Sequence, residues 1–271
     1  MRLRMTFPRA VRSESMRLLR SPLAPAHLAC ALAGGLACGA YFAVAVWDAS
    51  LGADAYVQLL GAMMPLMAGI VCGLAADEER RAGELANLTA VPSRSIAIAA
   101  KCAALWLMGL ATLALAVGVF AAILAGAGKL ALGAGTLALS VAGIAFGSAP
   151  LYALMMALSL RFGRNVAIGA GAVGLIFAFF SVGGLAHGLM TGELTAVDSG
   201  LLGLEPFALP ARLGSLAVEG AIAEAFGPAG AVSQVADAAL VAGLLCAALT
   251  LVAVTALLAW FERFEEGKSY A

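Results

Sequence analysis

Residues 100–127 read AKCAALWLMGLATLALAVGVFAAILAGA, an apolar run with one charged side chain, Lys101. A helix needs about 20 predominantly apolar residues to cross the hydrocarbon core of a bilayer, so this run is long enough to span a membrane. Similar runs occur at residues 28–47, 56–76, 130–160, 166–187 and 236–261. The sequence therefore predicts an all-α integral membrane protein whose six transmembrane helices form a single domain over residues 1–271.

The composition leaves no room for a separate water-soluble domain. Hydrophobic residues make up 63% of the chain and charged residues 12%, and the mean hydropathy is +0.99, whereas a soluble domain is about half apolar and a quarter charged. A cleaved signal peptide is the alternative interpretation of the first run. That run is too long for such a peptide, and a basic, Pro-containing segment of residues 1–27 precedes it.

The basic residues predict the orientation of the helices. All Lys and Arg residues except Lys129 and Arg212 lie before the first run, after the last run, or in and beside alternate connections. Because cytoplasmic loops carry the excess of Lys and Arg, both termini are expected in the cytoplasm. The arginine-rich start also contains apolar residues such as Phe7, Leu18 and Leu19, and it is expected to form an amphipathic helix in the membrane interface.

Several classes of site are not supported by the sequence. A GxGxxG match at residues 169–174 lies inside an apolar run, where glycines favour close helix packing, and the GAGK at residues 126–129 lacks the Ser or Thr of a P-loop. The cysteines and the two histidines form no metal-ligand or nucleophile pattern. We therefore expect no enzyme activity, metal, cofactor or nucleic-acid partner, and we attribute the basic amino end to orientation and anionic lipid.

The connection between the second and third runs has the most specific pattern. Residues 77–94 read DEERRAGELANLTAVPSR, and Lys101 follows. Leu85 and Leu88 share one helical face, Pro92 ends that helix, and Ser93 is placed to cap the next one. The segment is either a solvated connector or a short docking helix for a cytoplasmic partner.

This loop resembles that of the type-2 ABC exporter permeases, in which a charged run, a glycine and an apolar stretch precede Pro, a small residue and Arg. Glu84 and Ala86 depart from the commoner version and, with Asn87, are similar to the lantibiotic-immunity, or self-protection, subgroup. The tail from Trp260 to Lys268 resembles the same subgroup. The resemblance implies a loop that couples to the ATPase, with these residues: Glu78, Glu79, Arg80, Arg81, Gly83, Glu84, Leu85, Leu88, Pro92 and Arg94.

The resemblance also implies a function and partners. The chain would be a permease in a bacterial plasma membrane, paired with itself or a sister permease and driven by a separate ABC ATP-binding subunit that binds the ATP. The runs hold no ionisable residue near their middle, which also places the energy source on another chain. The cargo would be a lantibiotic or similar cationic peptide. Two alternatives stay open: export of a drug, lipid or polysaccharide, and a membrane immunity protein that does not transport.

The long connection between the fifth and sixth runs carries acidic residues. The resemblance implies short re-entrant helices on the external side here. We hypothesise that its acidic side chains attract a cationic peptide, and the alternative is that external loops are acidic because basic residues are kept inside. The residues are Glu193, Asp198, Glu205, Glu219 and Glu224.

Overall fold

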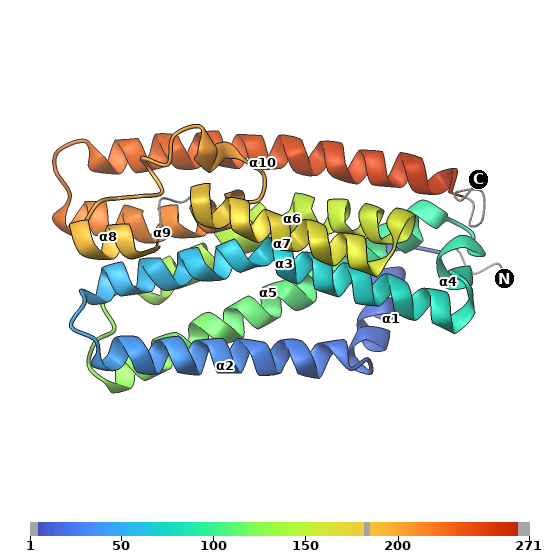
Figure 1. The fold of residues 1–271 in the computed structure, drawn as a ribbon, viewed down its shortest axis with the longest axis horizontal. Coiled ribbons are helices and arrows are strands. Elements are labelled where there is room, and N and C mark those ends of the chain that lie inside the picture. The colour runs from blue at the N-terminus through green and yellow to red at the C-terminus, as the bar shows by residue number, and fades with distance from the viewer. Residues whose placement is uncertain (1–4, 182–184, 265–271) are drawn as a thin grey trace.

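The computed structural model describes residues 5–181 and 185–264, and all regular elements in these ranges are helical. Figure 1 shows long helices running side by side, with α1 and α4 at one end of the bundle and α8 at the other; we call these the α1 end and the α8 end. The elements are α1 (Phe7–Leu19), α2 (Leu23–Val44), α3 (Ala49–Gly83), α4 (Ala86–Thr89), α5 (Arg94–Gly126), α6 (Ala134–Phe162), α7 (Arg164–Ser181), α8 (Leu185–Thr191), the 3-10 turn η1 (Leu202–Leu204), α9 (Leu209–Phe226) and α10 (Ala231–Glu262).

Six helices are long and apolar enough to cross a membrane: α2, α3, α5, α6, α7 and α10. This finding confirms the predicted all-α membrane fold.

The helices extend beyond several of the apolar runs because polar residues cap them. The Asp48 carboxylate accepts the N–H groups of Ser50 at 2.9 Å and Leu51 at 3.0 Å, and Ser93 Oγ accepts the N–H of Ile96 at 3.3 Å, as predicted for the start of α5.

Helices α3 and α6 form the centre of the bundle. In each, 61% of the most apolar 18-residue window is buried, against 17% in α2 and in α10. The outer faces of these peripheral helices expose large apolar side chains, among them Leu36 on α2 and Leu244 and Leu251 on α10. Such surfaces suit contact with lipid tails or with another membrane helix.

Glycines set the closest helix contacts. A Cβ at Gly35 of α2 would lie 2.7 Å from the Ala116 carbonyl oxygen of α5, and a Cβ at Gly171 of α7 would lie 2.6 Å from that of Pro65 in α3. These distances leave no room for a side chain, so the backbones approach directly. Gly171 belongs to the GxGxxG match, and its position agrees with the helix-packing interpretation of that motif.

The segment between α7 and α10 forms a re-entrant hairpin. From α8 the chain returns toward mid-bundle, and α9 then runs back to the α8 end (Figure 1). A Cβ at Gly147 of α6 would lie 2.6 Å from Pro210 Cα, and one at Gly61 of α3 would lie 2.2 Å from Ala211 Cα. The first turn of α9 is therefore seated against the two central helices.

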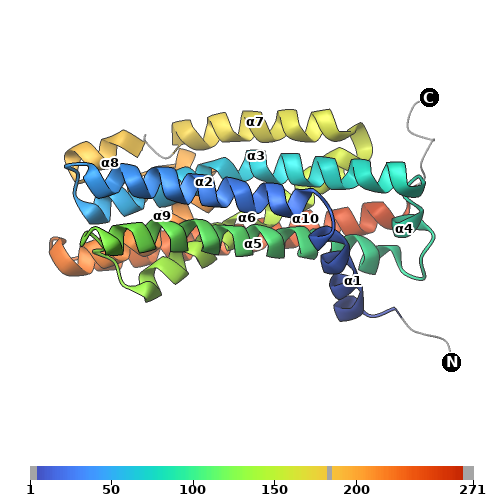
Figure 2. The ribbon, with the colours of Figure 1, turned by 90° about the horizontal axis from the view of Figure 1, so that it is seen from below.

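Helix α1 lies across the α1 end of the bundle (Figure 2). Its sequence is amphipathic, none of its residues is fully buried, and Arg17 lies in its last turn. This is the arrangement predicted for an interfacial helix. Because α1 packs on α5, its polar face meets the ends of α3 and α5, where the charged side chains of the bundle gather.

Candidate functional site

The turn after α3 reverses the chain at the α1 end. Glu84 and Leu85 have φ values of +50° and +62°, a left-handed conformation that is unfavourable for residues with a Cβ. The N–H of Glu84 donates to the Arg80 carbonyl at 2.8 Å, and the N–H of Leu85 donates to that of Glu79 at 3.3 Å. These bonds satisfy carbonyls at the end of α3 and direct the chain into α4.

Leu85 and Leu88 hold this turn in place. Both side chains have 0% exposure and belong to the main hydrophobic core. The two leucines do lie on the same side, as their spacing predicts. Their side chains pack into the hydrophobic core of this protein, so they are not presented to a partner. The exposed residues of the loop are Glu78, Arg81, Ala82, Gly83, Glu84, Ala86, Asn87, Ala90 and Pro92.

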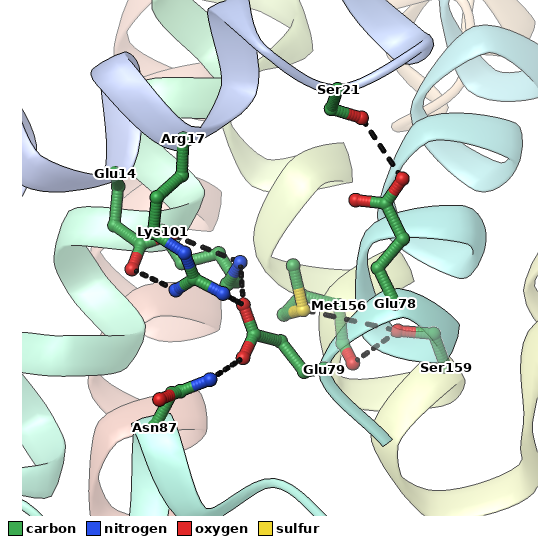
Figure 3. Close-up of polar contacts among 9 residues, drawn as sticks. All are labelled: Glu14, Arg17, Ser21, Glu78, Glu79, Asn87, Lys101, Met156 and Ser159. Atoms are coloured by element: carbon green, nitrogen blue, oxygen red, sulfur yellow. Dashed lines mark hydrogen bonds and ion pairs between the residues drawn. The ribbon is translucent and has the colours of Figure 1, made fainter. Parts of the chain in front are cut away.

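Glu79 is a buried carboxylate at the centre of a charge cluster (Figure 3). Its side chain is 1% exposed. Oε1 accepts from Arg17 Nη2 at 2.6 Å and from Lys101 Nζ at 2.7 Å, while Oε2 accepts from Asn87 Nδ2 at 3.0 Å. One carboxylate thus joins α1, α3, α4 and α5.

Glu14 completes this cluster from α1. Its carboxylate lies 2.9 Å from Arg17 Nη1 and 2.9 Å from Lys101 Nζ. Two carboxylates and two cations balance each other, which is what allows charges to be buried at all. Burial acts to lower the pKa of Arg17, but Glu14 and Glu79 together outweigh it, so the pKa of Arg17 is raised above its ordinary value. We call Glu14, Arg17, Glu79, Asn87 and Lys101 the Glu79 cluster.

Two arginines connect the loop to the remaining helices. Arg80 Nη2 donates to the carbonyls of Ser159 at 3.1 Å and Leu160 at 2.7 Å, which close α6. Arg94 donates to the Thr89 carbonyl at 3.1 Å through Nε and to the Phe264 carbonyl at 2.8 Å through Nη1. Cations at helix ends interact favourably with such carbonyls. The loop is therefore attached to α6 and to the end of α10.

Asp77 makes a similar connection to α7. Its carboxylate lies 3.1 Å from Arg164 Nη1 and 3.3 Å from Arg81 Nη2. Ser21, which follows α1, donates to Glu78 at 2.9 Å. A cavity of about 380 Å³ adjoins these groups, with Arg17, Glu78 and Lys101 in its wall.

A second polar cluster lies toward the α8 end. Gln58 Nε2 lies 2.7 Å from Asp54 Oδ2, 2.9 Å from Thr195 Oγ1 and 3.1 Å from Ser215 Oγ, and these three acceptors share its two hydrogens. Ser215 Oγ also donates to Asp54 Oδ1 at 2.5 Å. These buried bonds fasten α9 and the segment before it to α3. The hydropathy pattern missed this cluster because it assigned Asp54 to a connection; the signal was the Asp54–Gln58 spacing of one helical turn.

The five acidic residues of the α7–α10 segment do not share one environment. The Glu219 side chain is buried, and its carboxylate accepts the N–H groups of Ala196 at 2.7 Å and Val197 at 3.1 Å. Its expected role in attracting a peptide is therefore wrong, because the side chain holds the hairpin together instead of facing solvent. Glu205 is half-buried, whereas the exposed members are Glu193, Asp198 and Glu224.

Residues 10–181 match the family model described as ABC-2 family transporter protein. The chain belongs to this family. It is accordingly a multi-pass membrane protein and the permease subunit of a type-2 ABC transporter. No curated protein gives a significant match, and neither does any solved structure.

The ABC-2 match runs from within α1 to the end of α7 and so contains the whole Glu79 cluster. Sequence reasoning singled out Glu79 and the loop, but it noted Lys101 only as the one charged residue of the third run. It missed Glu14 and Arg17 as partners, because they are distant in sequence and no local spacing links them to Glu79. The end of the tail, residues 265–268, lies outside the described residues.

Proposed function

We propose that this ABC-2 permease belongs to an ATP-driven exporter that removes a lantibiotic or similar antimicrobial peptide from the plasma membrane of the producing bacterium. In this proposal the α1 end faces the cytoplasm, as the excess of Lys and Arg there supports. A separate ABC ATP-binding subunit docks at this end, and a second permease, identical or related, pairs with the chain in the membrane.

The observation that carries the coupling proposal is the attachment of an exposed turn to the charge cluster around the buried carboxylate of Glu79. Gly83 and Glu84 are exposed, and Glu79 lies one helical turn before Gly83 in α3. Through Glu79, Arg80 and Arg94, a displacement of this turn is passed to α1, α5, α6 and α10. An ATPase that seats on the exposed turn would therefore move several membrane helices at once.

The docking proposal is tested by co-purification. The tagged chain is expressed with candidate ABC ATP-binding subunits, and the bound subunit and its ATP hydrolysis are measured. Glu84→Lys reverses the charge of the exposed turn and is expected to reduce both. Glu224→Lys reverses an exposed charge at the α8 end and serves as the matched control. Equal retention of the ATPase by both variants would count against docking at this turn.

The substrate proposal is tested by survival. Cells that produce the permease and its ATP-binding partner are exposed to purified lantibiotics, and protection is compared with cells whose partner cannot hydrolyse ATP. Export predicts that protection depends on hydrolysis. Protection without hydrolysis identifies a non-transporting immunity protein, and an assembled, active complex without protection identifies another cargo.

A further inference from the structure

The polar cluster around Gln58 belongs to a network that contains a buried carboxylate from each of two helices. Asp54 of α3 is 7% exposed and Glu219 of α9 is 1% exposed. Ser215 connects them, since its hydroxyl donates to Asp54 and Glu219 lies one helical turn further along the same face of α9. The two carboxylates are therefore close enough for the charge of Asp54 to disfavour a second negative charge on Glu219.

Among the described residues, the buried cation of this network is Arg212 of α9, which is 6% exposed. Its Nε donates to the Ala196 carbonyl at 3.0 Å, while Glu219 accepts the N–H of the same residue at 2.7 Å. Arg212 and Glu219 thus hold Ala196 from both sides and attract each other. Arg212 Nη1 has no hydrogen-bond partner among the described residues, so this atom is not already paired with another carboxylate.

The helices packed against α3 and α9 bring no further charged side chain to the network in the part of the chain that the structure describes. The charged residues of α5 and α7 lie at the α1 end, as does Arg161 of α6. Helices α2 and α8 contain no Asp, Glu, Lys or Arg, and the side chain of His187 in α8 lies outside the described residues. Asp237 of α10 is exposed.

The segment before α9 adds negative charge instead of balancing it. Glu193 and Asp198 are exposed, and Asp198 adds to the negative potential at Glu219. Two buried carboxylates thus face one guanidinium, and full ionisation would leave an uncompensated buried charge, which costs free energy. Burial and the charge of Asp54 raise the pKa of Glu219 to about 8. Val197, whose N–H Glu219 accepts at 3.1 Å, adjoins the exposed Asp198, so water lies near the network.

We propose that Asp54 and Glu219 form a proton-binding site, in which the two carboxylates hold one proton between them at neutral pH and Arg212 balances the remaining negative charge. The Ser215 hydroxyl, 2.5 Å from Asp54 Oδ1, can donate to the ionised carboxylate or accept from the protonated one. The proton comes from water at the α8 end and returns to it. The site is independent of the ATPase partner and of the peptide cargo, so its test does not depend on either.

The proton is detected by infrared spectroscopy of the full chain in a detergent without ester groups, during a titration from acid to alkaline pH. Exposed Asp and Glu side chains lose their protons near ordinary pKa values of about 4. We expect the C=O band of one protonated carboxyl per chain to persist at neutral pH and to disappear in a single step on further alkalinisation. A chain without such a band at neutral pH overturns the proposal, and this result needs no variant.

Single neutralisations identify the two carboxylates. In Asp54→Asn or Glu219→Gln, one carboxylate remains against Arg212, so both variants should lose the band. A band that survives in either variant would show an ordinary buried acid instead of a shared proton and overturns the proposal. Glu205→Gln is the control, because Glu205 is half-buried in the same segment but makes none of the bonds of this network. It should keep the band, and loss of the band in this control alone assigns the proton to Glu205.

Hydrogen exchange of the unmodified chain tests the site by a second measurement. Loss of the proton leaves two buried negative charges against one positive charge, so the hairpin should become less stable as the pH rises through the infrared step. Protection of the Ala196 and Val197 amides, corrected for the intrinsic exchange rate, should fall by at most about tenfold per pH unit, the limit for one linked proton. The amides of α4 should keep their protection. Constant protection of Ala196 and Val197 across the step would place the titrating carboxyl elsewhere and overturn the proposal.

Discussion

Lys101 Nζ lies 2.7 Å from Glu79 Oε1, and both side chains are buried where α3 and α5 meet beneath α1. A buried ion pair is costly to form and still more costly to break, because removing one partner leaves the other charge without compensation. The pair therefore fixes how these helices meet at the α1 end.

Neutralising Glu79 should destabilise the protein strongly. Glu79→Gln leaves Arg17 and Lys101 to share Glu14 as their remaining carboxylate, so it should cost about 3 kcal/mol, the low end for a broken buried pair, measured as a lowered thermal unfolding temperature in detergent. Glu78→Gln is the adjacent control, since Glu78 is exposed and accepts one hydrogen bond from Ser21. Similar melting of the two variants would refute the central role of Glu79.

Glu84 should lower the stability of the folded chain and at the same time promote binding of the ATP-binding subunit. Its φ of +50° is unfavourable for a residue with a Cβ, so Glu84→Gly should stabilise the chain by about 1 kcal/mol. The same change removes the exposed carboxylate, so binding of the ATP-binding subunit should weaken. Thermal unfolding and co-purification check the two effects separately. A less stable Glu84→Gly variant would show that contacts of the Glu84 side chain contribute more free energy than the left-handed backbone costs.

The Ser215 hydroxyl should be needed to hold α9 against α3. Ser215→Ala leaves Asp54 Oδ1 without its donor, and an unpaired buried oxygen costs about 1–3 kcal/mol, whereas Gln58 keeps Asp54 and Thr195 as acceptors. Faster hydrogen exchange is expected in residues 209–226. Ser233→Ala removes an exposed bond to the Gly230 carbonyl and is the control. Slow exchange retained in α9 would show that backbone packing alone secures the hairpin.

The exposed acidic residues at the α8 end should affect peptide encounter. Replacing Glu193 and Glu224 by Gln and Asp198 by Asn should slow the binding of a cationic lantibiotic at low ionic strength. The difference should shrink at high salt, since exposed charges are screened. The measurement is the binding rate of the peptide to both proteins at two salt concentrations. Equal rates at low salt would contradict the attraction. Glu219→Gln tests the buried position and should alter stability more than encounter.

The six membrane helices could be predicted because a run of apolar residues is a local property. The helix ends were harder to predict from the sequence. Helix α3 begins at Ala49, well before residue 56, because the Asp48 cap extends it. This extension brings Asp54 into the bundle. Short helices were expected between the fifth and sixth runs, but the seating of α9 against glycines of α3 and α6 depends on long-range contacts that no spacing reveals.

In the loop, the sequence predicted which side chains lie on the same face, but not which way that face points. Spacing shows that Leu85 and Leu88 share a face, but not that the face points inward, because this depends on the left-handed turn before α4. The partners of Lys101 are also set by the fold, since α1 crosses the end of α5 and brings Glu14 and Arg17 within reach.

Each half of the Glu79 cluster is electrically neutral by itself. Helix α1 contributes one carboxylate and one guanidinium, Glu14 and Arg17, which lie 2.9 Å apart, while the helical bundle contributes Glu79 and Lys101. If α1 lifts away, it takes a balanced pair with it and leaves a balanced pair behind, so neither surface keeps an orphan charge. The ion pairs would therefore require no proton and no counter-ion if helix α1 moved relative to α3 and α5.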